Sequence, residues 1–353
     1  MSRPGSPLNA APNAALNATH AQTQDHGSLA HAQQQTPGGA ATQASAIDRG
    51  SRTRSGPEVW TTEATSALAA DFRATLQKGV HGLCFSPYLE GQRPGSQVSE
   101  AQIRERLAIL RPHAGWVRSF SCTDGHEQTP RLAHELGLKT LVGAWLGTDA
   151  EINEREIQGV IEVARAGHAD IVAVGNEVML REDMSEDALL GCIQRVKDAL
   201  PGVPVGYVDA YFLFEKHPRI AAACDVVMCN CYPFWEGCPR EQALAYMQTM
   251  LARTRAAAPG KRVLISETGW PNQGSAFQGA VPSREGAMQY FVDTARWARD
   301  EGIELFYFSA FDEAWKVGAE GDVGACWGLW DAHGRPKFQR PDPDAALRFG
   351  ATP

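Results

Sequence analysis

The sequence contains no run of about 20 apolar residues, so it predicts no membrane-spanning helix. Its N-terminus also lacks the apolar core of a secretory signal peptide. On these grounds we expect a cytoplasmic protein by default. A periplasmic or extracellular location also stays open, if the protein is exported by another route or if its start site has been misassigned.

Basic residues are in the minority. The 33 Lys and Arg residues stand against 41 Asp and Glu residues, which gives a net charge of −8. The sequence has no basic stripe to offset this balance, and such a chain is a poor match for phosphate backbones and anionic membranes. We therefore predict no nucleic-acid partner.

Eight cysteines among 353 residues are too few and too scattered for a disulfide scaffold. Cys84, Cys122, Cys229 and Cys231 lie inside apolar runs, where cysteine usually serves as a small hydrophobic side chain. The Cys-x-Cys pair at 229 and 231 has no second Cys or His pair at zinc spacing. We predict mostly free, buried thiols and no metal. A bridge between Cys231 and Cys238 remains open.

Nucleotide-binding turns are missing as well. No Gly-x-Gly-x-x-Gly turn follows the first apolar run, and the sequence has no P-loop. Their absence disfavours a doubly wound open sheet, the structural alternative to the barrel predicted below. We predict no cofactor.

The chain divides into three parts by composition. Residues 1–56 are dominated by Ala, Gln, Asn, Thr, Ser, Gly and Pro, and they predict a disordered tail because they bury too little apolar surface to offset ordering entropy. Residues 57–342 have the apolar content of one folded domain. Residues 343–353 are assigned to a short C-terminal tail.

Eight short apolar runs recur from residue 80 onward, separated by amphipathic segments. Their spacing is near the ~30 residues of a βαβ unit, which predicts a single (β/α)8 barrel, an α/β fold whose active site lies at the C-terminal ends of its strands. A helix is also expected over residues 61–78, with Leu68, Phe72 and Leu76 on the face that covers the barrel bottom. The expected strands are Val80–Ser86, Trp116–Ser121, Lys139–Trp145, Asp170–Asn176, Val203–Val208, Asp225–Cys231, Arg262–Ser266 and Glu304–Phe311.

Two of these strands are followed by a glutamate. Residues 264–271 read Leu-Ile-Ser-Glu-Thr-Gly-Trp-Pro and place Glu267 where the strand stops, while residues 170–177 end in Gly-Asn-Glu and place Glu177 likewise. A lone glutamate of this kind is more often a salt-bridged strand-end acid. Two at one rim are what glycosidic cleavage needs, one as proton donor and the other as nucleophile or base.

The Ser-Glu-Thr-Gly-Trp-Pro stretch at 266–271 closely resembles the nucleophile motif of glycoside hydrolase family 17, the 1,3-β-glucanases and related glucan transglycosylases. Gly-Asn-Glu at 175–177 resembles the acid/base motif of the wider clan of retaining barrel glycosidases. The resemblance extends over about residues 79–338, and the loops look closer to bacterial members than to plant endoglucanases. It implies that Glu177 is the general acid/base and Glu267 the nucleophile.

The same resemblance implies a set of substrate-binding residues. Asn176 would hydrogen-bond the sugar 2-hydroxyl, and Tyr232, in a segment similar to the family's Asn-x-Tyr-Pro, would orient Glu267. The stretch 311–316 resembles an eighth-strand segment whose Glu and Lys line a subsite. The expected binding residues are Asn176, Tyr232, Phe234, Trp270, Glu313, Trp315 and Lys316.

The tryptophans favour a sugar site independently of the family. Of nine tryptophans, six follow apolar runs, on the rim where the site is expected. Flat apolar faces with a polar edge suit pyranose rings, although such residues also pack loops onto a barrel top. The two interpretations are evenly balanced for Trp327 and Trp330. The six are Trp145, Trp235, Trp270, Trp315, Trp327 and Trp330.

Two polar residues inside expected strands need explanations of their own. Arg118 would be a charge within a barrel strand and requires a partner, so we predict that it hydrogen-bonds a catalytic carboxylate. His81 has no second histidine two residues further on, so the His-x-His metal pattern of barrel hydrolases is absent. We expect His81 to be a hydrogen-bonded core residue.

Three functions fit the sequence: a retaining β-glucan hydrolase, a β-glucan transglycosylase with the same residues, and a non-catalytic glucan-binding barrel. The presence of both glutamates argues against the third. The first two share a glycosyl-enzyme intermediate and differ in whether water or a sugar hydroxyl attacks it. We predict a monomer that binds a β-glucan oligosaccharide or polysaccharide and cleaves it as 1,3-β-glucanases do.

Overall fold

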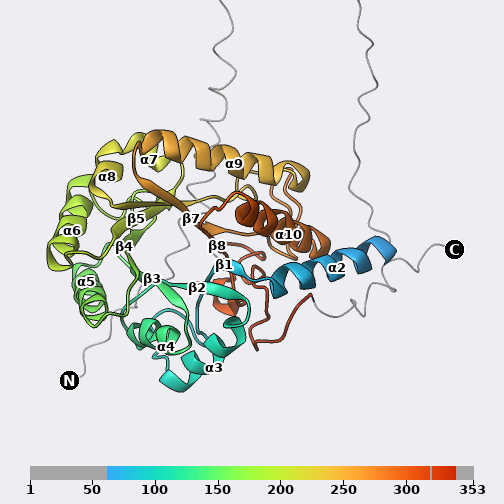
Figure 1. Ribbon diagram of the computed structural model, residues 1–353, viewed down its shortest axis with the longest axis horizontal. Helices are drawn as coiled ribbons and strands as arrows, with labels where there is room; N and C mark the ends of the chain where they lie inside the picture. Colours follow the sequence, from blue (N-terminus) through green and yellow to red (C-terminus); the bar gives the residue numbers. More distant parts are fainter. Residues whose placement is uncertain (1–61, 319, 339–353) are drawn as a thin grey trace, which may run out of the picture.

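The computed structural model describes residues 62–318 and 320–338, and in them eight parallel strands close into one barrel (Figure 1). Each strand pairs with the next along the chain, and the last pairs with the first. The order is that of a (β/α)8 barrel and rules out an open doubly wound sheet. The strands are β1 (Val80–Cys84), β2 (Ala114–Ser119), β3 (Lys139–Ala144), β4 (Ile171–Asn176), β5 (Val205–Ala210), β6 (Val226–Asn230), β7 (Arg262–Thr268) and β8 (Leu305–Tyr307).

Helices surround this barrel as an outer layer (Figure 1). They are α2 (Thr62–Gln77), α3 (Glu100–Leu110), α4 (Thr129–Glu135), α5 (Ala150–Arg165), α6 (Glu186–Ala199), α7 (Leu213–Lys216), α8 (Pro218–Ala223), α9 (Arg240–Ala257) and α10 (Arg284–Asp300), with the 3-10 turns η3 (His126–Gln128) and η4 (Ala314–Lys316). Ser99, Asp149, Ser185 and Ser283 begin α3, α5, α6 and α10 by accepting backbone N–H groups of the first turn. These caps satisfy donors that a helix leaves unpaired.

Helix α2 forms where the apolar spacing of residues 61–78 predicts it, but it does not cover the barrel bottom. It lies alongside α10 in the outer layer (Figure 1). Phe72 packs on Phe291 of α10, with ring centroids 4.9 Å apart, and on Phe338, at 5.0 Å. The apolar face of α2 is therefore buried by a neighbouring helix and by the last described residue.

Strand β7 is longer than the sequence predicts. The expected strand stops at Ser266, whereas the observed one continues through Glu267 and Thr268. Its pairing with β6 shifts register between Cys229 and Asn230, so Asn230 lies opposite Glu267. Irregularities of this kind re-aim side chains next to active sites. This one brings the ends of β6 and β7 together at the C-terminal rim.

The cysteines agree with the prediction of free thiols. All eight are unbridged and seven of them are buried. The alternative of a Cys231–Cys238 bridge is not realised, because both residues are free thiols. The Cys231 sulfur instead lies 3.7 Å from that of Cys229. The thiols therefore act in packing within the barrel and its outer layer.

Every element described above falls inside the range 57–342. The predicted tails, residues 1–56 and 343–353, lie outside the described residues. Within the described part of the chain, no helix combines the length and the apolar character needed to cross a membrane.

Candidate active site

Glu177 follows directly after β4, in a turn that leaves the strand. Its φ of 53° is in the left-handed region, which is uncommon for a residue with a side chain, and its N–H donates to the Val208 carbonyl at 2.8 Å. The side chain is buried, and Oε1 accepts a hydrogen bond from Asn230 Nδ2 at 2.8 Å. Burial, and after it the nearby Glu267 carboxylate, raises the pKa of Glu177 well above its ordinary value. This carboxyl group is therefore arranged to hold a proton.

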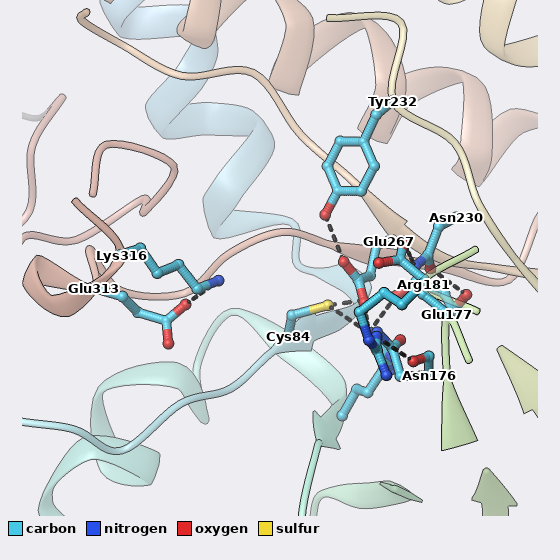
Figure 2. A network of polar contacts seen from close by, with 11 residues as sticks. Cys84, Asn176, Glu177, Arg181, Asn230, Tyr232, Glu267, Glu313 and Lys316 are labelled. Atoms are coloured by element: carbon cyan, nitrogen blue, oxygen red, sulfur yellow. Dashed lines mark hydrogen bonds and ion pairs between the residues drawn. The ribbon is translucent and has the colours of Figure 1, made fainter. Parts of the chain in front are cut away.

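Glu267 is the last residue but one of β7, and its side chain has partners on both oxygens. Arg118 of β2 forms a buried ion pair with Oε1. Tyr232 Oη donates to Oε2 at 2.6 Å (Figure 2). A cation and a phenol hydroxyl are donors that stabilise the anionic form of a carboxyl group.

Arg118 joins the ends of three strands. Its Nη1 contacts Glu267 on β7, and its Nη2 donates to Asn176 Oδ1 on β4 at 2.7 Å. The guanidinium also stacks over Phe120, 4.4 Å from the ring centroid. A fully buried charge is costly unless it is paired in this way. The predicted contact between Arg118 and a strand-end carboxylate is confirmed.

Asn230 directs a hydrogen bond toward Glu177. Its Oδ1 accepts the Ser266 hydroxyl at 2.8 Å, which leaves Nδ2 to face Glu177. This contact was not expected from the sequence, although Asn230 opens the Asn-x-Tyr-Pro segment that singled out Tyr232. It depends on the register between β6 and β7, which no local pattern reveals.

Both carboxyl groups line one pocket. Its walls include Asn176 and Tyr232, as expected, and three of the six rim tryptophans. A third carboxyl group, that of Glu320, also lines it, and the sequence around Glu320 contains no strand or motif that would have indicated this. Aromatic faces around paired carboxyl groups suit a sugar ring. The lining residues are Trp145, Asn176, Glu177, Tyr232, Trp235, Glu267, Phe308, Glu320 and Trp327.

Phe234 and Trp270 do not line this pocket, contrary to expectation. Their exposed fractions are 0% and 1%, and their rings meet edge to face with centroids 5.4 Å apart. Trp270 Nε1 donates to the Val281 carbonyl at 3.2 Å, and Phe234 packs on Trp235 and Trp327. Both residues support the wall from behind, because the chain after β7 turns Trp270 into the protein interior.

Glu313 and Lys316 form a second buried ion pair, 2.7 Å between Oε2 and Nζ. Figure 2 shows it apart from the network around the two strand-end glutamates. Lys316 Nζ lies 4.2 Å from the centroid of the Phe308 ring, which is part of the pocket wall. Trp315 Nε1 donates to Glu313 Oε1 at 3.2 Å. The structure therefore places these three predicted residues beside the pocket wall and outside its lining.

His81 lies at the start of β1, at the opposite end of the barrel from the pocket. It stacks on Trp116 with centroids 5.4 Å apart and meets the Phe306 ring at 5.3 Å. It is half-buried among aromatic rings, whereas we expected a hydrogen-bonded core histidine. Among the residues that the structure describes, no three His, Cys, Asp or Glu side chains are grouped so as to hold a metal ion.

The fold and the two strand-end carboxyl groups define the class of protein. One carboxyl group has a pKa raised by burial, and the other is ion-paired. Both lie in one aromatic pocket at the C-terminal rim of a (β/α)8 barrel, and these are the components of a glycoside hydrolase site. Comparison with known families agrees with this class. Residues 82–328 match the model of the BtgE/BtgC glycoside hydrolase domain, and the chain belongs to that family.

Relatives of this chain include curated proteins and solved structures that cover about three quarters of it. A glucan 1,3-beta-glucosidase from Arthroderma benhamiae is 28% identical over an alignment of 301 residues that covers 79% of this chain and 96% of that protein. The glycoside hydrolase family 17 beta-1,3-glucanosyltransferase from Rhizomucor miehei is 26% identical with a TM-score of 0.67, over 75% of this chain and 98% of its own. Its active-site mutant in complex with laminaritriose has a TM-score of 0.66, 26% identity, and covers 74% of this chain and 96% of its own. These matches agree with the family 17 resemblance of the sequence.

Proposed function

We propose that this chain is a retaining glycosidase that acts on β-1,3-glucan. The observation that carries the proposal is the pair of opposite surroundings in one pocket: burial and the nearby Glu267 carboxylate raise the pKa of Glu177, whereas Glu267 is ion-paired with Arg118. The 1,3-linkage is supported by the names of the relatives, a glucan 1,3-beta-glucosidase and a beta-1,3-glucanosyltransferase.

The first step forms a glycosyl-enzyme. A carboxylate oxygen of Glu267 attacks C1 of a glucosyl unit while Glu177 gives its proton to the departing glycosidic oxygen. The C1–O bond breaks, and its electron pair leaves with that oxygen. Glu267 is then an ester of the sugar, and Glu177 is a carboxylate.

The second step reverses these roles. Glu177 removes a proton from an acceptor hydroxyl, whose oxygen attacks C1 and releases Glu267 as a carboxylate. Two inversions at C1 leave the configuration unchanged. Water as the acceptor gives hydrolysis, and a sugar hydroxyl gives transfer.

Asn176 is placed to bind the sugar in both steps. Its side chain lines the pocket, and its Oδ1 is occupied by Arg118 Nη2 at 2.7 Å. The amide Nδ2 is then the group that donates to the sugar 2-hydroxyl. Arg118 thereby sets the position of both Asn176 and Glu267.

Transfer to a sugar hydroxyl is the second candidate function, and it would use the same two glutamates. Trp145, Trp235 and Trp327 line the same pocket as the two glutamates, and aromatic side chains of this kind suit sugar rings. The glucanosyltransferase name of the structural relative supports the same alternative.

Defined 1,3-β-linked glucan oligosaccharides test both candidates. Products shorter than the substrate indicate hydrolysis, and products longer than the substrate arise only by transfer. Proton NMR of the first products should show the β-anomer. An α-anomer would contradict retention, and cleavage confined to 1,4-linked oligosaccharides would contradict the linkage. The double variant Glu177→Gln/Glu267→Gln, purified in parallel, excludes a contaminating enzyme.

Three finer expectations remain proposals. We propose a monomer, a cytoplasmic location by default, and loops closer to bacterial members of the family; the relatives named above are fungal. Light scattering of the purified chain tests the first proposal, and fractionation of the native cells tests the second. The third puts the endo-acting cleavage of plant endoglucanases in doubt, and the lengths of the product oligosaccharides test it.

A further inference from the structure

Another buried carboxyl group, that of Asp209, acts electrostatically on Glu177. Strand β5 was expected to end at Val208 but continues to Ala210, so Asp209 is part of the barrel sheet. Its side chain is 0% exposed. Its Oδ2 accepts the Tyr207 hydroxyl, and its Oδ1 accepts the Ala210 N–H at 2.7 Å. The mechanism above does not use this group.

Tyr207 connects Asp209 to the turn that carries Glu177. The Tyr207 hydroxyl oxygen accepts the N–H of Met179, two residues beyond Glu177, at 2.9 Å. On the other side of Glu177, a Cβ built on Gly175 would lie only 3.3 Å from the Tyr207 ring. Tyr207 therefore contacts the chain just before and just after the glutamate.

Arg181 supplies the positive charge in this part of the structure, and its recorded hydrogen bonds go to groups other than Asp209. It forms an ion pair with Asp183 at 2.7 Å. It also donates to the carbonyls of Asn176, at 2.6 Å, and Leu146, at 3.0 Å. Because Asp183 is its ionic partner, Arg181 offsets the charge of Asp209 only in part.

Three ionisable groups face Asp209: Tyr207 on its own strand, and Glu177 and Arg181 after β4. Burial raises the pKa of Asp209 to about 6, so it is anionic in neutral solution. A negative neighbour favours the protonated form of a carboxyl group. Asp209 acts in this direction on the pKa of Glu177, after burial and Glu267.

We propose that Tyr207 and Asp209 are positioning residues for Glu177: Tyr207 holds its turn, and the negative charge of Asp209 keeps the proton on Glu177 until the leaving oxygen takes it. Neither residue lines the pocket, so neither touches the sugar. The inference rests on the acid role of Glu177 in the proposed function and assigns two residues that this function does not require.

The variant Asp209→Asn tests the charge with little change of shape. kcat/KM is measured on a 1,3-β-linked oligosaccharide from about pH 4 to about pH 9. The basic limb of the profile should move to lower pH by about half a pH unit or more, because a neutral amide no longer favours the proton on Glu177. A folded Asp209→Asn variant whose basic limb stays in place overturns the proposal.

Asp225→Asn is the matched control. Asp225 lies at the opposite end of the barrel, where it accepts the Val205 N–H at 3.1 Å and pairs with Lys197 at 2.7 Å. The same chemical change there should leave the basic limb unmoved. Asp225 is exposed, unlike Asp209, so an equal shift in both variants means that the loss of a carboxylate anywhere has this effect, which also overturns the proposal.

Tyr207→Phe tests the contact with the turn and carries the test if Asp209→Asn does not fold. It removes the partner of both Asp209 and the Met179 N–H. Activity on the oligosaccharide should fall by about 10-fold or more. Activity on an aryl glucoside with a good leaving group should fall less, because that bond breaks without an acid. Equal losses on the two donors contradict a role through Glu177.

Glu177→Gln separates the failure of this inference from that of the proposed function. If the variant keeps full activity on the oligosaccharide, the acid role of Glu177 fails and the inference fails with it. If it loses that activity while Asp209→Asn and Tyr207→Phe leave the basic limb and the donor ratio unchanged, only the inference fails.

Discussion

Glu177 and Glu267 line the same pocket and follow the same kind of apolar strand, yet their surroundings are opposite. Glu267 has a donor on each oxygen, and one of them is the guanidinium of Arg118. Glu177 has the neutral amide of Asn230 as its donor, and burial and the negative groups near it favour its protonated form. Two identical side chains thus acquire different chemistry from their neighbours.

Removing each carboxyl group in turn should break this comparison most strongly. Glu267→Ala should abolish turnover of a natural glucan, a loss of several orders of magnitude, while sugar affinity largely survives on the aromatic walls. Azide, entering the vacated space, should restore turnover of an activated glycosyl fluoride and give the product of inverted configuration.

Glu177→Ala should respond with the opposite stereochemistry. An activated donor needs no acid, so its glycosyl-enzyme still forms on Glu267, and azide releases it with retained configuration. NMR of the glycosyl azides checks both variants. If the two configurations are exchanged, the roles assigned to the two glutamates are exchanged as well.

Removing the cation tests what distinguishes Glu267. Arg118→Met leaves a buried carboxylate without its ionic partner, and such a change costs about 3–5 kcal/mol of unfolding free energy. kcat should fall by about 100-fold or more, because removing one positioned donor from an active-site oxyanion typically lowers kcat on that scale. Urea unfolding and steady-state kinetics measure the two effects.

The double variant Arg118→Met/Glu267→Gln is the control for this stability effect. It no longer contains a buried unpaired charge, so it should recover much of the free energy of unfolding that Arg118→Met loses. A double variant as unstable as the single one would show that Arg118 stabilises the barrel through packing alone.

Tyr232→Phe should have a smaller effect, because it removes one donor and leaves the ion pair. A hydrogen bond to a charged group contributes about 1.5–3 kcal/mol, so kcat should fall by about 10- to 100-fold. Tyr290→Phe is a suitable control: its hydroxyl meets that of Thr268 at 2.6 Å within the protein interior. It should lower thermal stability and leave kcat nearly unchanged; equal kcat losses would contradict a specific role for Tyr232.

The pH profile sharpens the comparison from the side of Glu177. Its raised pKa means that the acid stays protonated well above the ordinary glutamate value of ~4.3, so the basic limb of kcat/KM should lie in that higher range. Asn230 donates to the ionised form and lowers the pKa, so Asn230→Ala should move the limb to still higher pH. A limb that moves down would show that Asn230 acts differently.

The smallest effects should separate the pocket wall from the residues behind it. Trp145→Ala removes a lining ring and should raise KM for an oligosaccharide with less change in thermal stability. Phe234→Leu removes part of a fully buried ring and should cost about 1 kcal/mol of stability with KM unchanged. For both variants, differential scanning calorimetry measures the stability and steady-state kinetics measures KM. A raised KM in Phe234→Leu would restore Phe234 to the binding residues.

The barrel and the strand-end glutamates could be predicted from the sequence because both follow from local patterns. Apolar runs at ~30-residue spacing are repeated βαβ units, and parallel strands place their C-terminal ends on one rim. The sequence also predicted that Arg118 pairs with a catalytic carboxylate, because a charge inside a strand must be paired, but it did not say which carboxylate. Strand ends were less predictable: β5 and β7 each continue two residues further, to Ala210 and Thr268.

The sequence by itself therefore determined the fold, the rim and the two carboxyl groups of this protein, because chain periodicity and residue type are enough for each. Only the tertiary structure decided which neighbours those groups meet. Asn230 reaches Glu177 through a register shift between β6 and β7. Asp209 is held in the extended β5 by Tyr207, and Trp270 turns inward. Contacts between strands far apart in sequence depend on register and packing, which are properties of the closed barrel as a whole.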